Sequence, residues 1–424
     1  MGATSWMRKR RPAGDDGRAG SSARAEVAVA RQPILDRDGS VVGYELLFRG
    51  AGTETAGVVD DRAATSTVIL DGLFDVGLSD LVGGNVAWVN VSRDFLLSVR
   101  PLPLPPRGVV LELLEDQLVD DELLGVLDEL VEEGFTIALD DFRLTASTER
   151  LLPYASIVKI DVIEHSGGGL EDLLARLRAD YPGLRLLAEK VETRSDWVRC
   201  SVLGFEIFQG YFFARPSRMQ RSRLPTHGLA SLSTMVELSA TEDVDELNRI
   251  ITRDAGLSIR LLRYANSAYA ALPRRVSSVQ EGLAWLGGGT VKRFAMMVAL
   301  ASAHDVPNEL LVTALMRARM CQQLSGAGDG PAADSFFTVG LFSVADALAD
   351  APMALVIDQL PLRYDIADAL LYGAGTLGEL LAGVIAYQRG DFNAAADLIA
   401  EHPDLQQVYR EAITWADRSI TELV

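Results

Sequence analysis

The chain has 424 residues, of which 48% are hydrophobic and 23% are charged, and its formal net charge at pH 7 is −19. This length favours about two or three domains, and the hydrophobic content is ample for packed cores. The strong negative charge argues against a broad nucleic-acid-binding surface, which needs a basic stripe, so no DNA or RNA partner is expected.

The first residues, 1–24, are rich in Gly, Ser and Arg and lack hydrophobic periodicity, which predicts a disordered tail. No charged segment precedes an apolar one, and apolar runs are interrupted by charges well before the ~20 residues of a membrane span. We therefore expect a cytoplasmic protein with no signal peptide and no membrane partner. Cys200 and Cys321 are expected to be buried small hydrophobes.

Residues 25–216 alternate short apolar runs with helical patterns. The runs typical of strands are 27–35, 41–48, 85–92, 109–115, 136–142, 157–162, 185–191 and 205–213. Helical spacing of apolar residues is clearest in 120–134 and 170–183. Repeated β–α units predict parallel strands and fit a modified (β/α) barrel better than an open sheet. The short link 36–40 predicts an antiparallel pair at the start.

The pattern changes at 217–228, "SRMQRSRLPTHG", where basic residues, Pro and Gly predict a linker. After it, residues 229–424 show almost only helical periodicity. The predicted fold is therefore an α/β barrel followed by an all-α domain.

Polar residues follow the predicted strands, one strand after another. In chain order they are Glu45, Asn90, Glu112, Asp140, Asp141, Lys159, Glu189, Glu192 and Gln209. In barrel enzymes the carboxyl ends of the strands face the active site, so these side chains should converge on one mouth.

These residues include six carboxylates, against Lys159 and Arg49 as the available cations. Such a cluster raises its own pKa values or repels itself apart unless a cation is bound. Carboxylate and amide oxygens without His or Cys suit Mg²⁺ or Mn²⁺, as one ion or as two bridged by Asp140. The alternative, helix caps or surface ion pairs, explains any one carboxylate better than the whole series.

Lys159 is one of only four lysines in the chain, and among carboxylates it could orient a water or a phosphate oxygen. A metal pair with a carboxylate base favours phosphodiester hydrolysis. A Mg²⁺-dependent lyase remains open on the chemistry alone.

The motifs "ARQPILDRDGSVVGYELLFR", "VNVS", "LELLE", "LDDF", "VKID", "LLAEKVET" and "FQGYFFARP", in this order, resemble the EAL domain of cyclic di-GMP phosphodiesterases. The second half, with "RDAGLSIRLLRYANSAY" and "VSSVQEGLAWLGG", resembles an HDOD domain. The chain therefore looks like a tandem EAL–HDOD signalling protein of bacteria, and cyclic di-GMP is the ligand that this implies.

The resemblance also implies roles for the residues, by motif position. Metal ligands would be Glu45, Asn90, Glu112, Asp140 and Asp141. Lys159 would hold the water and Glu189 would be the general base, with Glu192 supporting the site. Substrate contacts would come from Gln32, Arg49 and Gln209. The reaction would convert cyclic di-GMP to linear pGpG.

Several positions depart from the EAL pattern. Leu46 replaces the alanine of the signature, and Leu114 replaces a threonine. Residues 143–145, Arg-Leu-Thr, stand where glycine and small residues are expected, in a loop that also serves dimer contact, so a homodimer is among the expected assemblies. Arg143 is expected to pair with Asp141 and to compete with the second metal ion, and Lys190, in place of a glycine, to neutralise Glu189 or Glu192.

HDOD domains are related to HD phosphohydrolases but lack their metal ligands, which implies an interaction module with a protein partner. The dipeptide His304-Asp305 has no second histidine in the right region, so no catalysis is assigned to this half. Three hypotheses follow: a metal-dependent phosphodiesterase regulated by its helical half, a cyclic di-GMP receptor without turnover, and a protein scaffold. The complete carboxylate set favours the first two.

Overall fold

The computed structural model describes residues 28–49, 77–114, 117–164, 169–210, 226–266, 272–302, 307–328 and 330–423. The predicted tail and the dipeptide His304-Asp305 lie outside these ranges, as does most of the predicted linker.

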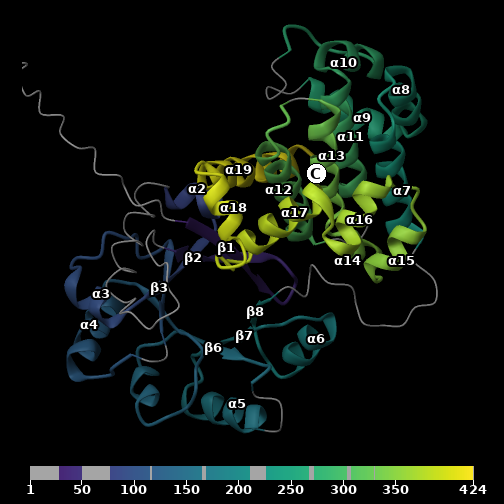
Figure 1. Ribbon diagram of the computed structural model, residues 1–424. Helices are drawn as coiled ribbons and strands as arrows, with labels where there is room; N and C mark the ends of the chain where they lie inside the picture. The colour runs from purple at the N-terminus through teal and green to yellow at the C-terminus, as the bar shows by residue number, and fades with distance from the viewer. Residues whose placement is uncertain are drawn as a thin grey trace, which may run out of the picture.

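The first part of the described chain is a closed barrel in which the strands follow one another from β1 to β8 (Figure 1). β1 is antiparallel to both of its neighbours, β2 and β8, and the other neighbouring pairs are parallel. The strands are β1 Ala28–Asp36, β2 Val41–Arg49, β3 Val86–Val91, β4 Val109–Leu113, β5 Thr136–Leu139, β6 Ile157–Asp161, β7 Arg185–Glu189 and β8 Ile207–Gln209. The predicted barrel with an antiparallel first pair is confirmed.

Helices follow most of the strands and cover the outside of the barrel. They are α2 Leu78–Val82, α3 Arg93–Ser98, α4 Asp121–Glu132, the 3₁₀ helix η1 Thr148–Leu151, α5 Gly169–Asp180 and α6 Arg194–Val202. Three of these helices begin at side-chain caps, because Ser92, Asp120 and Thr193 each accept a hydrogen bond from a first-turn backbone N–H. Each cap therefore defines the residue at which the preceding loop ends and the helix begins.

Between residues 226 and 423 the described chain contains helices and turns and no strand, which confirms the predicted all-α domain. Its helices are α7 Thr226–Ala240, α8 Val244–Arg253, α9 Ala255–Ala265, α10 Val279–Leu286, α11 Gly288–Ala301, α12 Asn308–Leu324, α13 Pro331–Phe342, α14 Ala345–Ala349, α15 Met353–Asp358, α16 Tyr364–Tyr372, α17 Gly375–Gln388, α18 Ala396–Glu401 and α19 Leu405–Leu423. α12 is the central helix, buried along most of its length and in contact with α13, α17 and α19. Because α7 begins at Thr226, the last three residues of the predicted linker are helical.

The stretch Tyr364–Gln388 is long and apolar enough to cross a membrane by composition, with a mean hydropathy of 1.5 and 28% of its most apolar window buried. The expectation that no apolar run approaches the length of a membrane span did not include this stretch. The stretch divides into α16 and α17 at Gly373, which has φ 64°, and α17 packs on α12 and β1. One such stretch is weak evidence for a membrane span, because core helices of soluble proteins meet the same criteria of length and composition.

The helical domain packs directly on one side of the barrel. α17 contacts β1, and α19 contacts α2. Figure 1 shows α17, α18 and α19 beside β1 and β2, so helices from the end of the chain lie against its first strands.

Candidate active site

The strands place polar side chains in one layer of the barrel interior, directly above an apolar layer. The apolar interior residues of β3 to β8 are Trp88, Val110, Ala138, Ile157, Leu187 and Ile207. Side chains two residues apart on a strand point to the same face. The residues two positions further on are Asn90, Glu112, Asp140, Lys159, Glu189 and Gln209. This alternation brings the predicted site residues together at the mouth, and Glu45 of β2 contacts three of them.

Lys159 lies at the centre of this cluster and is completely buried. Its Nζ is 2.6 Å from Asp140 Oδ1, 2.8 Å from Glu112 Oε1, 3.1 Å from Glu189 Oε1 and 3.4 Å from Glu45 Oε2. One ammonium therefore contacts four carboxylates that belong to, or directly follow, four different strands. An ammonium has three protons, so it cannot satisfy four carboxylates at once.

Several buried oxygens of the cluster lack a hydrogen-bond partner among the described residues. They are both carboxylate oxygens of Glu112, Asp140 Oδ1, Glu189 Oε2, Asn90 Oδ1 and Gln209 Oε1. Two of them, Glu112 Oε1 and Asp140 Oδ1, are within ion-pair distance of Lys159 but not in hydrogen-bond geometry with it. Buried unpaired acceptors are costly, so the site is arranged to meet further positive charge or donors.

Burial and mutual repulsion raise the pKa values of most of these carboxyl groups. Desolvation raises the pKa of Glu189 to about 8, and the charges of Asp140 and Glu45 act in the same direction against Lys159. Burial raises the pKa of Glu112 well above its ordinary value, with Glu45 adding to the effect. Desolvation also raises the pKa of Asp140.

Glu45 behaves differently from its neighbours. Burial alone would raise its pKa, but Lys159 and hydrogen bonds from Gln209 and Asn90 hold that pKa below the ordinary value. Gln209 Nε2 donates to Glu45 Oε2 at 2.5 Å, and Asn90 Nδ2 donates to Glu45 Oε1 at 3.0 Å. Glu45 is therefore held as a carboxylate in a fixed orientation.

The donor set fits a hard divalent cation in its chemistry, because it offers carboxylate and amide oxygens that have no other partner. As the side chains lie, no three His, Cys, Asp or Glu groups in the described ranges are arranged to hold a metal ion. The physical reason is the Lys159 ammonium, which takes the place between the carboxylates. Lys159 and a divalent cation would compete for the same oxygens.

Asp141 is held in an unusual backbone conformation beside the cluster. Its φ is 40°, in the left-handed region that costs energy for residues other than glycine. Its charge acts on Lys190 and on Glu189. No direct contact between Asp141 and Lys159 is present, so its part in a second metal site stays a prediction.

Lys190 forms its ion pair with Asp161, the last residue of β6, while the charge of Glu189, one of the two expected partners, also acts on it. Asp161 is almost fully buried and was not singled out from the sequence, although it belongs to the quoted motif "VKID". Lys190 has φ 55°, which explains why glycine is expected at this position. The ion pair with Asp161 offsets the strain of a lysine there.

The expectation that Arg143 pairs with Asp141 is wrong. Arg143 pairs with Glu164, on the loop after β6, and both side chains are exposed. Thr145 and Thr148 hydrogen-bond to each other and close the loop into a turn before η1. The described non-glycine residues with positive φ are Asp141, Lys190 and Asp350, so the backbone at 143–145 does not require glycine.

The three remaining predicted residues lie at the rim. Gln32, on β1, is opposite Glu45 in the strand register and accepts a hydrogen bond from Gln209. Arg49 is the last residue of β2, and its side chain lies outside what the structure describes. Glu192 is half-buried in the loop between β7 and α6.

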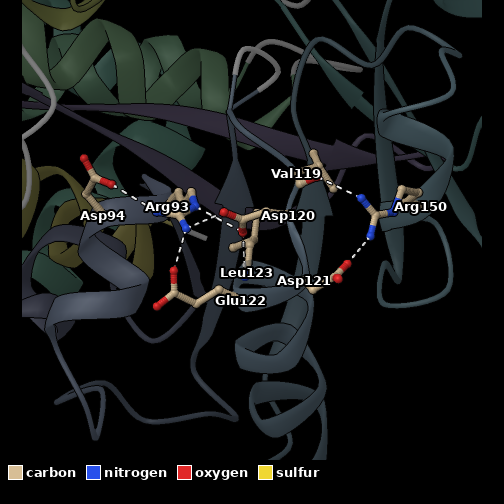
Figure 2. A network of polar contacts seen from close by, with 8 residues as sticks. All are labelled: Arg93, Asp94, Val119, Asp120, Asp121, Glu122, Leu123 and Arg150. Atoms are coloured by element: carbon tan, nitrogen blue, oxygen red, sulfur yellow. Dashed lines mark hydrogen bonds and ion pairs between the residues drawn. The ribbon is translucent and has the colours of Figure 1, made fainter.

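Two arginines tie together the loops that follow β3, β4 and β5 (Figure 2). Arg93, the first residue of α3, donates to Asp120 and to Glu122 at the start of α4. Arg150 of η1 donates to Asp121 and to the carbonyl of Val119. Because these loops follow the strand ends that hold Asn90, Glu112 and Asp140, the network fixes the rim around the cluster. Sequence reasoning missed it, since each arginine pairs across about 27–31 residues.

Residues 229–348 match the HDOD domain family. The chain is 31% identical over 396 residues to a Vibrio cholerae protein named cyclic di-GMP phosphodiesterase CdgJ, with 92% of each chain covered. It is 29% identical over 401 residues to the uncharacterized protein YuxH of Bacillus subtilis, with 92% of this chain and 98% of that one covered.

Among solved structures, the calcium and cy-diGMP complex of Klebsiella pneumoniae BlrP1 aligns at 24% identity and a TM-score of 0.37, over 45% of this chain and 56% of that chain. A similarity of that size does not bear on the function of this chain.

Proposed function

The chain belongs to the family of tandem EAL–HDOD signalling proteins, and from this premise we propose that its barrel hydrolyses cyclic di-GMP to linear pGpG in a reaction that needs a divalent metal ion. The observation that carries the proposal is the cluster at the mouth, where four carboxylates from β2, β4, β7 and the end of β5 surround Lys159 and leave buried oxygens unpaired. The name of the Vibrio cholerae relative supports the substrate.

Glu45, Asn90, Glu112 and Asp140 would hold the metal ion, with Asp141 completing a second position. A divalent ion bound there supplies Lewis acidity toward phosphate oxygens and lowers the pKa of water. Mg²⁺ and Mn²⁺ suit the all-oxygen donor set. Asn90 and Gln209 orient Glu45 for this role through the hydrogen bonds that they donate to it.

Glu189 is the proposed general base. Its raised pKa suits a group that accepts a proton near neutral pH. Glu189 takes a proton from the attacking water, the water oxygen bonds to phosphorus, and the P–O3′ bond breaks. The released 3′ oxygen receives a proton, so that the product carries a 5′ phosphate and a 3′ hydroxyl.

Lys159 provides a fixed positive charge for the negative charge that develops during attack. Its pKa lies well above the ordinary value: burial alone would lower it, but the surrounding carboxylates Glu112, Glu45, Glu189 and Asp140 outweigh that effect. It therefore stays protonated and acts as a donor rather than as a base. Gln32, Arg49 and Gln209 would contact the nucleotide, and Glu192 would support the site.

The test is incubation of the full chain with cyclic di-GMP and Mg²⁺ or Mn²⁺, with pGpG measured by chromatography. We expect product that disappears on addition of EDTA, and a loss of at least about 100-fold in rate for Glu189→Gln, which keeps the shape but removes the base. Glu192→Gln, outside the Lys159 contacts, is the matched control and should lose less. Equal rates for Glu189→Gln and wild type would exclude the proposed base.

A second candidate function is a cyclic di-GMP receptor without turnover. The contact of Lys159 with all four carboxylates favours it, because the ammonium compensates part of their charge and would compete with a divalent cation for the same oxygens. Binding measured by calorimetry, together with no pGpG in the same preparation, would establish this second function. In either case we propose a cytoplasmic protein whose helical domain contacts a protein partner.

A further inference from the structure

The helical domain reaches the mouth of the barrel at one turn, formed by Arg389 and Gly390 between α17 and α18. The carbonyl oxygen of Arg389 accepts a hydrogen bond of 2.9 Å from Gln32 Nε2. A Cβ added to Gly390 would lie 2.3 Å from Leu47 Cδ1, so this turn sits directly against β2. Leu47 is two residues from Glu45 on the same strand.

From this turn a continuous hydrogen-bond chain leads to Glu45. Gln32 Nε2 donates to the Arg389 carbonyl, and Gln32 Oε1 accepts from Gln209 Nε2 at 3.1 Å. The same Gln209 Nε2 donates to Glu45 Oε2 at 2.5 Å. Three successive hydrogen bonds therefore connect the backbone of the helical domain to a carboxylate in the centre of the barrel.

The direction of each amide in this chain is determined by its neighbours. A backbone carbonyl can only accept, so Gln32 must present its NH₂ group to Arg389 and its oxygen to Gln209. Gln209 must then present its NH₂ group to both Gln32 and the Glu45 carboxylate. The Glu45 carboxylate can also only accept, so acceptors at both ends impose the same order on the two amides. Without the Arg389 carbonyl, the Gln32 NH₂ group would lose its partner, and the Gln32 oxygen that Gln209 donates to would no longer be held in place.

The first strand is held firmly to the helical domain beside this chain. The Arg31 guanidinium, 5% exposed, lies 3.5 Å from Asp417 of α19 and 4.1 Å above the Tyr44 ring. The Arg31 backbone N–H donates to the Tyr409 hydroxyl at 3.1 Å. Tyr44, the residue before Glu45, donates to Glu309 at 3.0 Å. Movement of the helical domain would therefore move β1 and β2 together.

We propose that Gln32 is a positioning residue through which the Arg389–Gly390 turn sets the orientation of Glu45, and that the helical domain thereby controls the affinity of the barrel for its divalent ion. This inference rests on the proposed function to the extent that Glu45 is a metal ligand. It assigns to Gln32 a role in addition to contact with the nucleotide.

The experiment measures Mn²⁺ binding to the full chain by calorimetry, for wild type and for Gly390→Val. The added side chain is expected to push the turn away from β2 and to break the Gln32–Arg389 hydrogen bond. Partners of metal ligands are worth about 10–100-fold in affinity, and Gln32 lies one bond further out, so we expect Mn²⁺ binding to weaken by about 3–10-fold. Gln32→Ala, which leaves the turn intact, should have the same effect.

Gly373→Val is the matched control. Gly373 also has positive φ at the end of a helix in the same domain, but no atom lies within 4 Å of its added Cβ. It carries the same backbone strain without pressure on β2, and its Mn²⁺ affinity should equal that of wild type. Melting temperatures of both valine variants show that they are folded.

The double variant Gly390→Val with Gln32→Ala shows whether the two changes act through the same hydrogen-bond chain or weaken Mn²⁺ binding independently. If both changes act through one hydrogen-bond chain, the double variant is no weaker in Mn²⁺ binding than either single variant. Additive losses would overturn the proposal, as would wild-type affinity in Gln32→Ala.

The wild type alone tests the proposed function. If the wild type does not bind Mn²⁺, both the proposed metal site and the proposed control of its affinity by the helical domain are overturned. If the wild type binds Mn²⁺ and forms pGpG, and Gln32→Ala binds Mn²⁺ as tightly as the wild type does, only the proposed coupling is overturned.

Discussion

Lys159 is the residue on which the electrostatics of the barrel depend. It is a fully buried ammonium, and its four carboxylate neighbours are each at most 15% exposed. Removing one partner of a buried charge pair leaves uncompensated charge in a low dielectric, which costs more than the pair contributes. Here the groups left without a cation would be four buried carboxyl groups, of which Glu45 is the one held in its charged form by a lowered pKa.

Lys159→Met is therefore expected to lower the free energy of unfolding by about 3–5 kcal/mol at neutral pH, as measured by urea denaturation in EDTA. The loss should shrink at acidic pH, because the carboxylates become protonated. Glu112→Gln serves as the control, since it removes a like charge from the same cluster and should not lower stability. A stable Lys159→Met protein at pH 8 would show that the carboxylates are already neutral.

Glu309 provides a pH dependence at the contact between the domains. Burial raises its pKa from 4.5 to about 7, although Arg31 and the hydrogen bond from Tyr44 act in the opposite direction. Its stabilising contribution is complete below pH 4.5 and is lost as the pH rises through about 7, because the folded state then has to hold a buried carboxylate.

The difference between these pKa values corresponds to about 3 kcal/mol at most, at 1.36 kcal/mol per unit. We expect Glu309→Gln to be more stable than wild type at pH 8 and to lose this advantage at pH 4.5, measured by denaturation at each pH. Tyr44 keeps an acceptor in the variant. An advantage independent of pH would contradict the assignment to Glu309.

At the scale of elements, two glycines show how packing decides the effect of one substitution. Gly340 lies in α13 where the helix crosses α12, and a Cβ there would be 2.5 Å from the backbone nitrogen of Ala318. Gly125 lies on the exposed side of α4, with no atom within 4 Å of an added Cβ.

Gly340→Ala should destabilise the protein by about 1–3 kcal/mol, because the two helices must separate. Gly125→Ala should stabilise it by about 0.5–1 kcal/mol, because alanine loses less entropy in a helix. Thermal melting of both variants checks the pair. Equal shifts of the same sign would show that helix propensity, and not the α12–α13 crossing, dominates at Gly340.

At the scale of the whole molecule, the barrel and the helical domain share a charged and aromatic contact. Arg31 connects β1 with α2 through the Leu81 carbonyl and with α19 through Asp417 at 3.5 Å. It also faces Met316 of α12. A buried contact of this kind links the unfolding of the two parts, because separating them exposes the ion pair and the aromatic rings.

Full-length protein is accordingly expected to unfold in one calorimetric transition, and Arg31→Met in two, with the barrel melting first. Arg150→Met removes an exposed ion pair at the rim, 43% and 96% exposed, and should leave a single transition. A single transition for Arg31→Met would mean that apolar contacts between the domains suffice for coupling.

The sequence by itself determined the architecture and which side chains share the polar layer at the mouth of the barrel. Strand periodicity and polar residues at the strand ends predicted the barrel, and alternation along each strand explains why Asn90, Glu112, Asp140, Lys159 and Glu189 share one layer. These features are local: they depend on residues one or two positions apart, so a pattern in the chain is enough to reveal them.

Only the tertiary structure decided which charges meet and what the helical domain touches. The partner expected for Arg143 was wrong, and the ion pair of Lys190 with Asp161 was not foreseen, because the direction in which a loop leaves its strand determines which carboxylate lies within reach. The bond between Gln32 and Arg389 joins residues 357 positions apart. Contacts of this kind arise when two separately formed bodies pack together, and the periodicity of neither body encodes the position of the other.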